Sequence, residues 1–109
     1  MKPGFASTPE PPYVAVIFTS RMNAGNSGYA DMAAEMVALA KDQPGFLGVE
    51  SVRNSEGVGI TVSYWRDEES VRAWKEVDRH RTAQAAGRAK WYGHYEVRIA
   101  TVTRAYAGP

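Results

Sequence analysis

The stretch "FLGVESVRNSEGVGITVSYW", residues 46–65, decides the fold of this chain. Residues 46–54 and 58–65 are rich in β-branched and aromatic side chains, and they bracket the short, glycine-containing connection "SEG". Such runs favour strands because branched and aromatic side chains pack well on a pleated surface. Two of them joined by so short a link predict a β-hairpin.

The segments before the hairpin predict a strand and then an amphipathic helix. Residues 13–20, "YVAVIFTS", are apolar at nearly every position, which is typical of a strand buried on both faces. Farther along, apolar side chains recur at spacings of three and four, which indicates one face of a helix. These side chains are Tyr29, Met32, Ala33, Met36, Val37 and Ala40. We expect Pro44 and Gly45 to end this helix.

The segments after the hairpin predict a second helix and a final strand. Asp67 is a suitable N-cap, and the two glutamates that follow it place negative charge at the positive end of the helix dipole. We expect this helix to run to about Lys90, with a break near Asp78 as the alternative. Residues 95–106, "YEVRIATVTRAY", predict a long strand.

The resulting β-α-β-β-α-β order predicts an α+β protein of the ferredoxin-like class. In this class a four-stranded antiparallel sheet carries its helices on one face. A sheet covered on one face alternates apolar and polar residues, but residues 13–20 do not alternate. A second copy is the simplest cover for the other face, so we expect a homodimer built sheet against sheet.

Length and composition narrow the class of protein further. A chain of 109 residues with 44% hydrophobic and 23% charged residues predicts one globular domain, over residues 12–107. Four prolines among the first 12 residues predict a flexible tail over residues 1–11. A net charge of +1 gives no general attraction for nucleic acid or for anionic lipid, and we expect neither as a partner. The chain has no cysteine, no signal-like start and no apolar run of membrane-spanning length, so a cytoplasmic location is expected.

Residues 72–95 hold both histidines of the chain and two of its three tryptophans. If residues 73–91 form one continuous helix, six side chains at spacings of three and four share a face, which we expect to look inward. They are Ala73, Val77, His80, Gln84, Gly87 and Trp91. His80 is then either a histidine bonded to a neighbour on the helix face, or the proton shuttle or axial ligand of a pocket.

The aromatic side chains of the chain also allow two interpretations. Large rings are common in cores and interfaces, where they bury much area. Together with Met32 and Met36, however, the rings on several predicted elements can line an apolar pocket with a few polar tips. The rings in question belong to Tyr29, Tyr64, Trp65, Trp74, Trp91, Tyr92 and Tyr95.

Other site chemistries are not predicted. His80 and His94 lack the i, i+4 spacing of a helical metal pair, so we expect no protein-held metal. The chain has no GxGxxG or GxxxxGK[ST] stretch, which leaves it without a nucleotide-binding motif.

Several segments taken together resemble the antibiotic biosynthesis monooxygenase family. They are "QPGFLGVESVR" (43–53), "GITVSYWRDEESVRAWKE" (59–76) and "GRAKWYGHYEVRIATVTRAY" (87–106), with His80 between the last two. The resemblance covers about residues 13–106. It implies the dimeric α+β barrel, in which ferredoxin-like domains pair sheet to sheet.

The resemblance implies one of two oxygenase chemistries. In cofactor-free members, a deprotonated phenolic ring reduces oxygen inside a dry pocket. In haem-degrading members, the site holds an Asn of the first strand, a helix Trp and a His ten residues later. Trp74 matches that Trp, but the residue ten positions later is Gln84, and the middle of the first strand has no Asn.

The sequence analysis therefore predicts a small dimeric monooxygenase without a bound cofactor, acting on a hydrophobic aromatic or quinol-like molecule. We expect His80, Trp74 and Trp65 to be catalytic, with His80 as base or hydrogen-bond partner. The expected substrate-binding residues are Tyr64, Trp91, Tyr29, Met32, Met36 and Gln84. The alternatives are a haem-binding or haem-degrading monooxygenase with His80 as axial ligand, and a non-catalytic dimeric binding or accessory module.

Overall fold

The computed structural model describes residues 3–23, 29–84 and 92–109, and leaves the side chains of residues 29–32 and 81–84 undescribed. In chain order the elements are β1 (Tyr13–Met22), α1 (Tyr29–Lys41), β2 (Phe46–Arg53), β3 (Val58–Trp65), α2 (Glu68–Gln84) and β4 (Tyr92–Val102). This is the predicted βαββαβ order, and the ferredoxin-like α+β class is confirmed.

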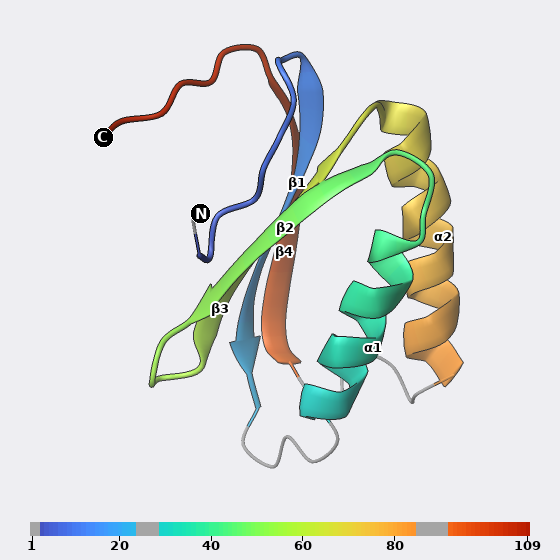
Figure 1. Ribbon diagram of the computed structural model, residues 1–109. Coiled ribbons are helices and arrows are strands. Elements are labelled where there is room, and N and C mark those ends of the chain that lie inside the picture. Colours follow the sequence, from blue (N-terminus) through green and yellow to red (C-terminus); the bar gives the residue numbers. More distant parts are fainter. Residues whose placement is uncertain (1–2, 24–28, 85–91) are drawn as a thin grey trace.

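The strands form one antiparallel sheet in the order β2-β3-β1-β4. Both helices cover the same face of this sheet, as Figure 1 shows. Helix α1 packs against β2, and α2 packs against β1 and β3. Strand β4 is the edge strand farthest from α1.

Strand β1 carries apolar side chains on both faces, as its sequence predicts. Its Val14 and Val16 lie opposite Trp65 and Ser63 of β3, on the face toward the helices. The alternate residues, Tyr13 and Ala15, are buried on the opposite face. We call this second face the outer face of the sheet.

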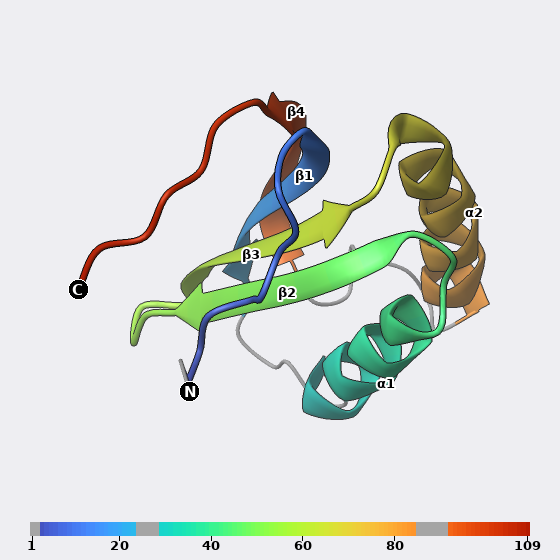
Figure 2. The ribbon, with the colours of Figure 1, turned by 45° about the horizontal axis from the view of Figure 1, so that its top comes forward.

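The N-terminal segment that the sequence predicts as a tail lies across the outer face. The backbone N–H of Ala6 donates to Glu50 Oε2 of β2 at 3.0 Å, and the Thr8 hydroxyl is hydrogen-bonded to the Tyr13 phenol at 3.0 Å. Figure 2 shows this arm crossing β3 and then following β2. Gly48 allows the approach, because a Cβ at this position would lie 2.8 Å from the Ala6 Cβ.

The core lies between α2 and the part of the sheet nearest to it. Trp65 at the end of β3 is 0% exposed, and it is surrounded by buried Val14 and Val71. Its ring stacks on Trp74 of α2, with ring centroids 5.7 Å apart and an interplanar angle of 22°. Phe46 meets Trp65 edge-on, at 5.5 Å between ring centroids. These rings bury the large apolar area that holds the helix on the sheet.

Two predicted boundaries differ from the structure. The last strand spans Tyr92–Val102 rather than residues 95–106. It is set by pairing with β1, in which Tyr13 lies opposite Val102 and Met22 lies opposite Tyr92, so residues after Val102 have no partner there. The alternative break of α2 near Asp78 is wrong, because the helix is continuous from Glu68 to Gln84.

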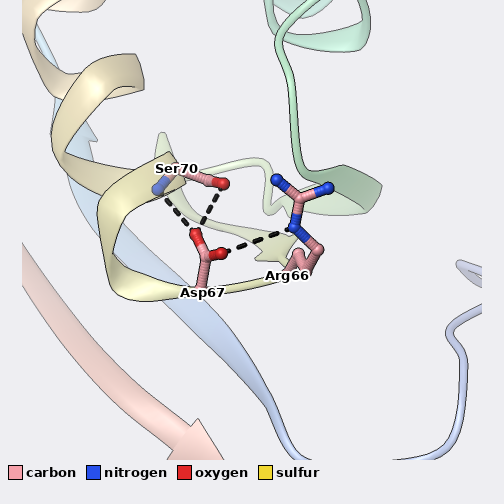
Figure 3. A network of polar contacts seen from close by, with 3 residues as sticks. All are labelled: Arg66, Asp67 and Ser70. Carbon is pink, nitrogen blue, oxygen red and sulfur yellow. Dashed lines mark hydrogen bonds and ion pairs between the residues drawn. The ribbon is translucent and has the colours of Figure 1, made fainter.

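Asp67 caps the N-terminus of α2, as predicted. Its Oδ1 accepts hydrogen bonds from the Ser70 backbone N–H at 2.8 Å and from the Ser70 hydroxyl at 2.7 Å (Figure 3). Its Oδ2 is paired with Arg66 Nε at 3.4 Å. The bonds from Ser70, followed by the contact with Arg66, lower the pKa of Asp67 below its ordinary value.

Replacing Asp67 should destabilise the helix start in a pH-dependent way. Asp67→Ala should lower the melting temperature at about pH 7, because two donors of Ser70 lose their acceptor. The lowered pKa means that the charged carboxylate stabilises the fold at neutral pH, and that this stabilisation is lost as the pH falls through the folded-state pKa. The difference in melting temperature between the parent protein and Asp67→Ala should therefore shrink below about pH 4.

Asp67→Asn is the matched control, because an amide oxygen still caps the helix but does not titrate. It should melt between the parent and Asp67→Ala at neutral pH. Calorimetric scans from about pH 7 to about pH 3 measure all three proteins. A gap between the parent and Asp67→Ala that stays constant over this range would contradict the titration of this carboxylate.

Candidate functional site

A pocket of about 470 Å³ lies between the two helices and the sheet. Its lining comes from β1, β2, β3, β4, α1 and α2, and most of the side chains are apolar or aromatic. A cavity of about 150 Å³ holds one benzene ring. The pocket is therefore large enough for two or three fused rings, and it falls within the usual size range of small-molecule sites.

The floor of the pocket consists of two rows of side chains that run across the sheet. The first row is Val49, Ser63, Val16 and Ile99, and the second is Ser51, Thr61, Phe18 and Val97. In both rows β3 contributes a hydroxyl, while β1 and β4 contribute only apolar side chains. The floor is thus polar toward β2 and β3 and apolar toward β1 and β4.

The hydroxyls of the floor are hydrogen-bonded to neighbours. Ser51 Oγ and Thr61 Oγ1 lie 2.7 Å apart across β2 and β3. The Trp65 Nε1–H donates to Ser63 Oγ at 2.9 Å. Trp65 itself does not line the pocket, so it contacts this site through Ser63.

The walls of the pocket come from the two helices. Helix α1 contributes Met36 and Val37 among its apolar side chains. Helix α2 contributes the Trp74 ring together with the charged groups of Lys75, Asp78 and Arg79. Arg79 is paired with Glu76 one turn earlier, at 3.0 Å. The pocket therefore combines an apolar interior with charged groups on one wall.

Strand β4 completes the pocket with exposed apolar side chains. Tyr95, Val97 and Ile99 are between 40% and 47% exposed although they face the helices. Among the described elements, neither helix has β4 as a main packing partner, so the described part of the helices leaves these side chains only partly covered. Phe18 of β1 stacks on Tyr95 at 5.4 Å between ring centroids. The edge of the sheet thus offers an apolar surface to a ligand.

The structure places some predicted site residues in this pocket and others away from it. Trp74 and Met36 line it, and their predicted catalytic and substrate-binding roles stay predictions. Trp65 is wholly buried behind Trp74 and contacts the ring of that residue instead of the pocket. Tyr64 lies on the outer face, because successive side chains of a strand point to opposite faces. The structure therefore places Tyr64 and Trp65 on opposite faces of the sheet and does not bring them together.

His80 is exposed and is not among the described residues that line the pocket. The predicted inward face of α2 is wrong in register, since Ala73 on that face is also exposed. The inward face instead carries Val71, Trp74 and Asp78. This face buries a valine and a tryptophan, which removes far more apolar area from water than Ala73 and His80 would.

The remaining predicted site residues lie outside the described part. They are the side chains of Tyr29, Met32 and Gln84, and the whole of Trp91. Their predicted roles stay predictions.

Six polar residues of the pocket were not predicted as site residues: Ser51, Thr61, Ser63, Lys75, Asp78 and Arg79. The hydroxyls of residues 61 and 63 were predictable from the sequence, because alternation along a strand places both residues on the same face as Trp65. Asp78 follows from Trp74 by helical spacing, once Trp74 is known to face inward.

The described residues contain neither a side-chain cluster suited to a metal ion nor a helix suited to crossing a membrane. No three His, Cys, Asp or Glu side chains within residues 3–23, 29–84 and 92–109 are grouped as for a metal ion. Neither described helix is long and apolar enough to cross a membrane.

Comparison with known sequences identifies close relatives. The sequence profile of the family described as antibiotic biosynthesis monooxygenase matches residues 14–86. The uncharacterized protein YqjZ of Bacillus subtilis (strain 168) is 52% identical over 99 residues, which cover 91% of this chain and 87% of that protein.

Comparison with solved structures identifies the same fold. SnoaB, a cofactor-independent oxygenase from Streptomyces nogalater, superimposes with a TM-score of 0.69 at 17% identity, over 87% of this chain and 97% of SnoaB. NE2512, a protein of unknown function from Nitrosomonas europaea, gives a TM-score of 0.68 at 15% identity, over 90% of this chain and 96% of that one. At such identities the likeness is one of fold.

Tyr64 lies on the outer face, and the pKa of its phenol can be measured by titration. Its phenol donates to Glu50 Oε1 at 2.6 Å. Burial, followed by this hydrogen bond and the Glu50 charge, raises the pKa of Tyr64 to about 12. Glu50→Gln removes the charge, so the pKa of Tyr64 should fall toward its ordinary value, as read from tyrosinate absorbance against Tyr64→Phe. Glu56→Gln, in the hairpin turn, is the control and should leave the titration unchanged.

Proposed function

The chain belongs to the antibiotic biosynthesis monooxygenase family, and we propose that it is an oxygenase that oxidises a hydrophobic aromatic or quinol-like molecule. The pocket between the helices and the sheet is its proposed site. One observation carries the proposal: about 470 Å³ of mainly apolar space is bordered by the Trp74 ring, by the hydroxyls of two serines and a threonine, and by a carboxylate. Such a site suits a fused aromatic ligand with a few oxygen substituents.

The proposed reaction needs only the substrate and dioxygen. A phenol with a ring C–H is converted to a quinone. One oxygen atom enters the ring at that carbon and the other leaves as water together with the two hydrogens lost by the substrate. The substrate loses four electrons and dioxygen gains four, so no further reductant is required. SnoaB, which shares the fold, is a cofactor-independent oxygenase, and we extend that property to this chain as part of the proposal.

The residues of the pocket have distinct proposed roles. The Trp74 ring packs against the substrate ring, and the apolar part of the floor keeps water out. Asp78 is the only carboxylic acid among the described residues that line the pocket. We therefore assign to Asp78 the removal of the phenolic proton, which makes the ring electron-rich enough to reduce dioxygen.

The sequence prediction gave His80 the role of base or hydrogen-bond partner. An exposed histidine outside the described lining is less well placed for that role than Asp78. The same position is unfavourable for an axial ligand of haem held in this pocket. His80 therefore serves as the comparison residue on the same helix.

We also propose that two copies of the chain pair through their outer faces. Val52 and Ile60, which lie opposite each other on β2 and β3, are 77% and 48% exposed there. Ile17 and Val62 form the adjacent pair on the same face. Exposed apolar side chains grouped on a sheet favour association, and a two-fold axis brings the same patch of both copies together.

The pairing can be tested by sedimentation at micromolar concentration. The expected species has twice the 12.0 kDa mass of one chain, with an interface above about 1,200 Å². Ile60→Lys should shift it toward the single chain, because a charge is placed in the apolar patch. Ala73→Lys is the control, since Ala73 is exposed on α2, away from the outer face. A parent protein that sediments only as one chain would exclude the dimer.

The proposed base can be tested by oxygen uptake with a panel of naphthols and hydroquinones. Asp78→Asn keeps the shape of the side chain but cannot accept the proton, so kcat should fall by about 100-fold. His80→Ala should change kcat by less than about threefold, because the ring lies outside the described lining. Product analysis should show one atom of labelled dioxygen in each quinone.

The reverse result, with loss of activity in His80→Ala alone, would return the role of base to His80. A parent protein that binds members of the panel without consuming oxygen would identify the chain as a binding module instead of an oxygenase.

A further inference from the structure

The Ser63 hydroxyl has a constrained orientation on the floor of the pocket. Its oxygen accepts the Trp65 Nε1–H at 2.9 Å. Within the part of the chain that the structure describes, Ser63 has no second hydrogen-bond partner. A serine hydroxyl that accepts one bond still carries a hydrogen to donate. That hydrogen is therefore available on the pocket side.

The surroundings of Ser63 favour an acceptor from a ligand. Its neighbours in the same row are Val49 on β2 and Val16 on β1, which offer no polar atoms from their side chains. A hydroxyl hydrogen among apolar side chains is costly to leave unpaired. A ligand oxygen that enters the pocket at this point would satisfy it.

Trp65 fixes the direction in which Ser63 can donate. The indole is 0% exposed and is held between Trp74 and Phe46, so its N–H cannot turn toward another acceptor. An indole nitrogen is a donor only, so Ser63 must be the acceptor of this bond. The tryptophan thus acts on the pocket as a positioning residue, through the serine.

The remainder of the same row indicates how the ligand lies. From Ser63 the row continues over Val16 to Ile99 on β4. Neighbouring strands lie about 4.8 Å apart, so this apolar path is roughly 10 Å long. Phe18 and Val97 form a parallel apolar path beside it. A ligand with its oxygen at Ser63 can therefore lay two or three fused rings across β1 and β4.

We propose that Ser63, oriented by the Trp65 indole, donates a hydrogen bond that selects fused-ring ligands carrying a carbonyl or phenolate oxygen at one edge. This assignment rests on the proposed function, because it uses the same pocket, and it narrows the substrate class. The oxygen lies at the β3 side of the floor, and the apolar rings lie over β1 and β4.

A pair of probes without a phenol group tests the selection by binding, with no turnover required. The probes are 9-fluorenone and fluorene, which have the same three fused rings and differ in one carbonyl oxygen. Calorimetry or tryptophan quenching gives the two dissociation constants. We compare the ratio of the fluorene dissociation constant to the 9-fluorenone dissociation constant. This ratio should be about three- to tenfold larger in the parent protein than in Ser63→Ala.

Three variants separate the hydrogen bond from general packing. Ser63→Ala should remove the preference for 9-fluorenone and leave fluorene binding nearly unchanged. Ser63→Thr keeps a hydroxyl at this position and should retain the preference. Thr101→Val removes a hydroxyl from the same face of the sheet but outside the described lining, and it should have no effect on the preference.

Trp65→Phe tests the positioning role, because it keeps an aromatic ring in the core but removes the indole N–H. Loss of the Ser63 hydroxyl orientation should bring the two dissociation constants closer together. Damage to packing alone should weaken the binding of both probes equally. If this variant does not fold, the Ser63 variants still decide the proposal.

Two results would overturn the proposal, and they differ in what else they affect. Equal preference in the parent and in Ser63→Ala would exclude Ser63 as the selecting donor and leave the oxygenase proposal standing. No binding of either probe would exclude the pocket as a site for fused rings, and the proposed function would fail with it.

Discussion

The stack of Trp65 on Trp74 joins the sheet to α2, and the geometry of the pocket depends on it. The two rings lie 5.7 Å apart between centroids, and the sheet residue of the pair is 0% exposed. Two large rings packed against each other remove a large apolar area from water between these elements. The same pair also separates the solid core from the pocket, because Trp65 belongs to the core and Trp74 lines the pocket.

The stack also sets the rotation of α2 about its axis. An α-helix turns by about 100° for each residue. Once Trp74 faces the sheet, Asp78 lies only about 40° from it around the helix, whereas His80 lies roughly 120° away. The position of Asp78 in the lining and the exposure of His80 therefore have one cause. A catalytic base proposed on α2 must therefore lie on the same side of the helix as Trp74.

The fold was predictable from the sequence because its signals are local. The runs on each side of "SEG", the helical spacing before Pro44 and the cap at Asp67 each fix one element, and their order fixes the topology. The face of α2 was not predictable from spacing alone, since Val71, Trp74 and Asp78 fit a helical stripe as well as Ala73, Val77 and His80 do. Only the partner ring across the sheet decides between these stripes. Tyr64, by contrast, was misplaced although strand alternation separates it from Trp65.

Strand β3 contributes side chains to both surfaces of the sheet. Its Ser63 and Trp65 face the pocket, whereas Val62 and Tyr64 face outward, where Glu50 and the N-terminal arm meet them. A strand that is mainly apolar or aromatic on both faces has few polar side chains. The few hydroxyl groups on it are therefore candidates for contacts with a ligand. Because the two surfaces use alternate residues, a substitution at Ile60 alters the outer face without removing a pocket contact, and one at Ser63 alters the pocket without touching the outer face. The separation follows from the pleat of the strand, and it allows the proposed ligand selection and the proposed pairing of two copies to be tested independently.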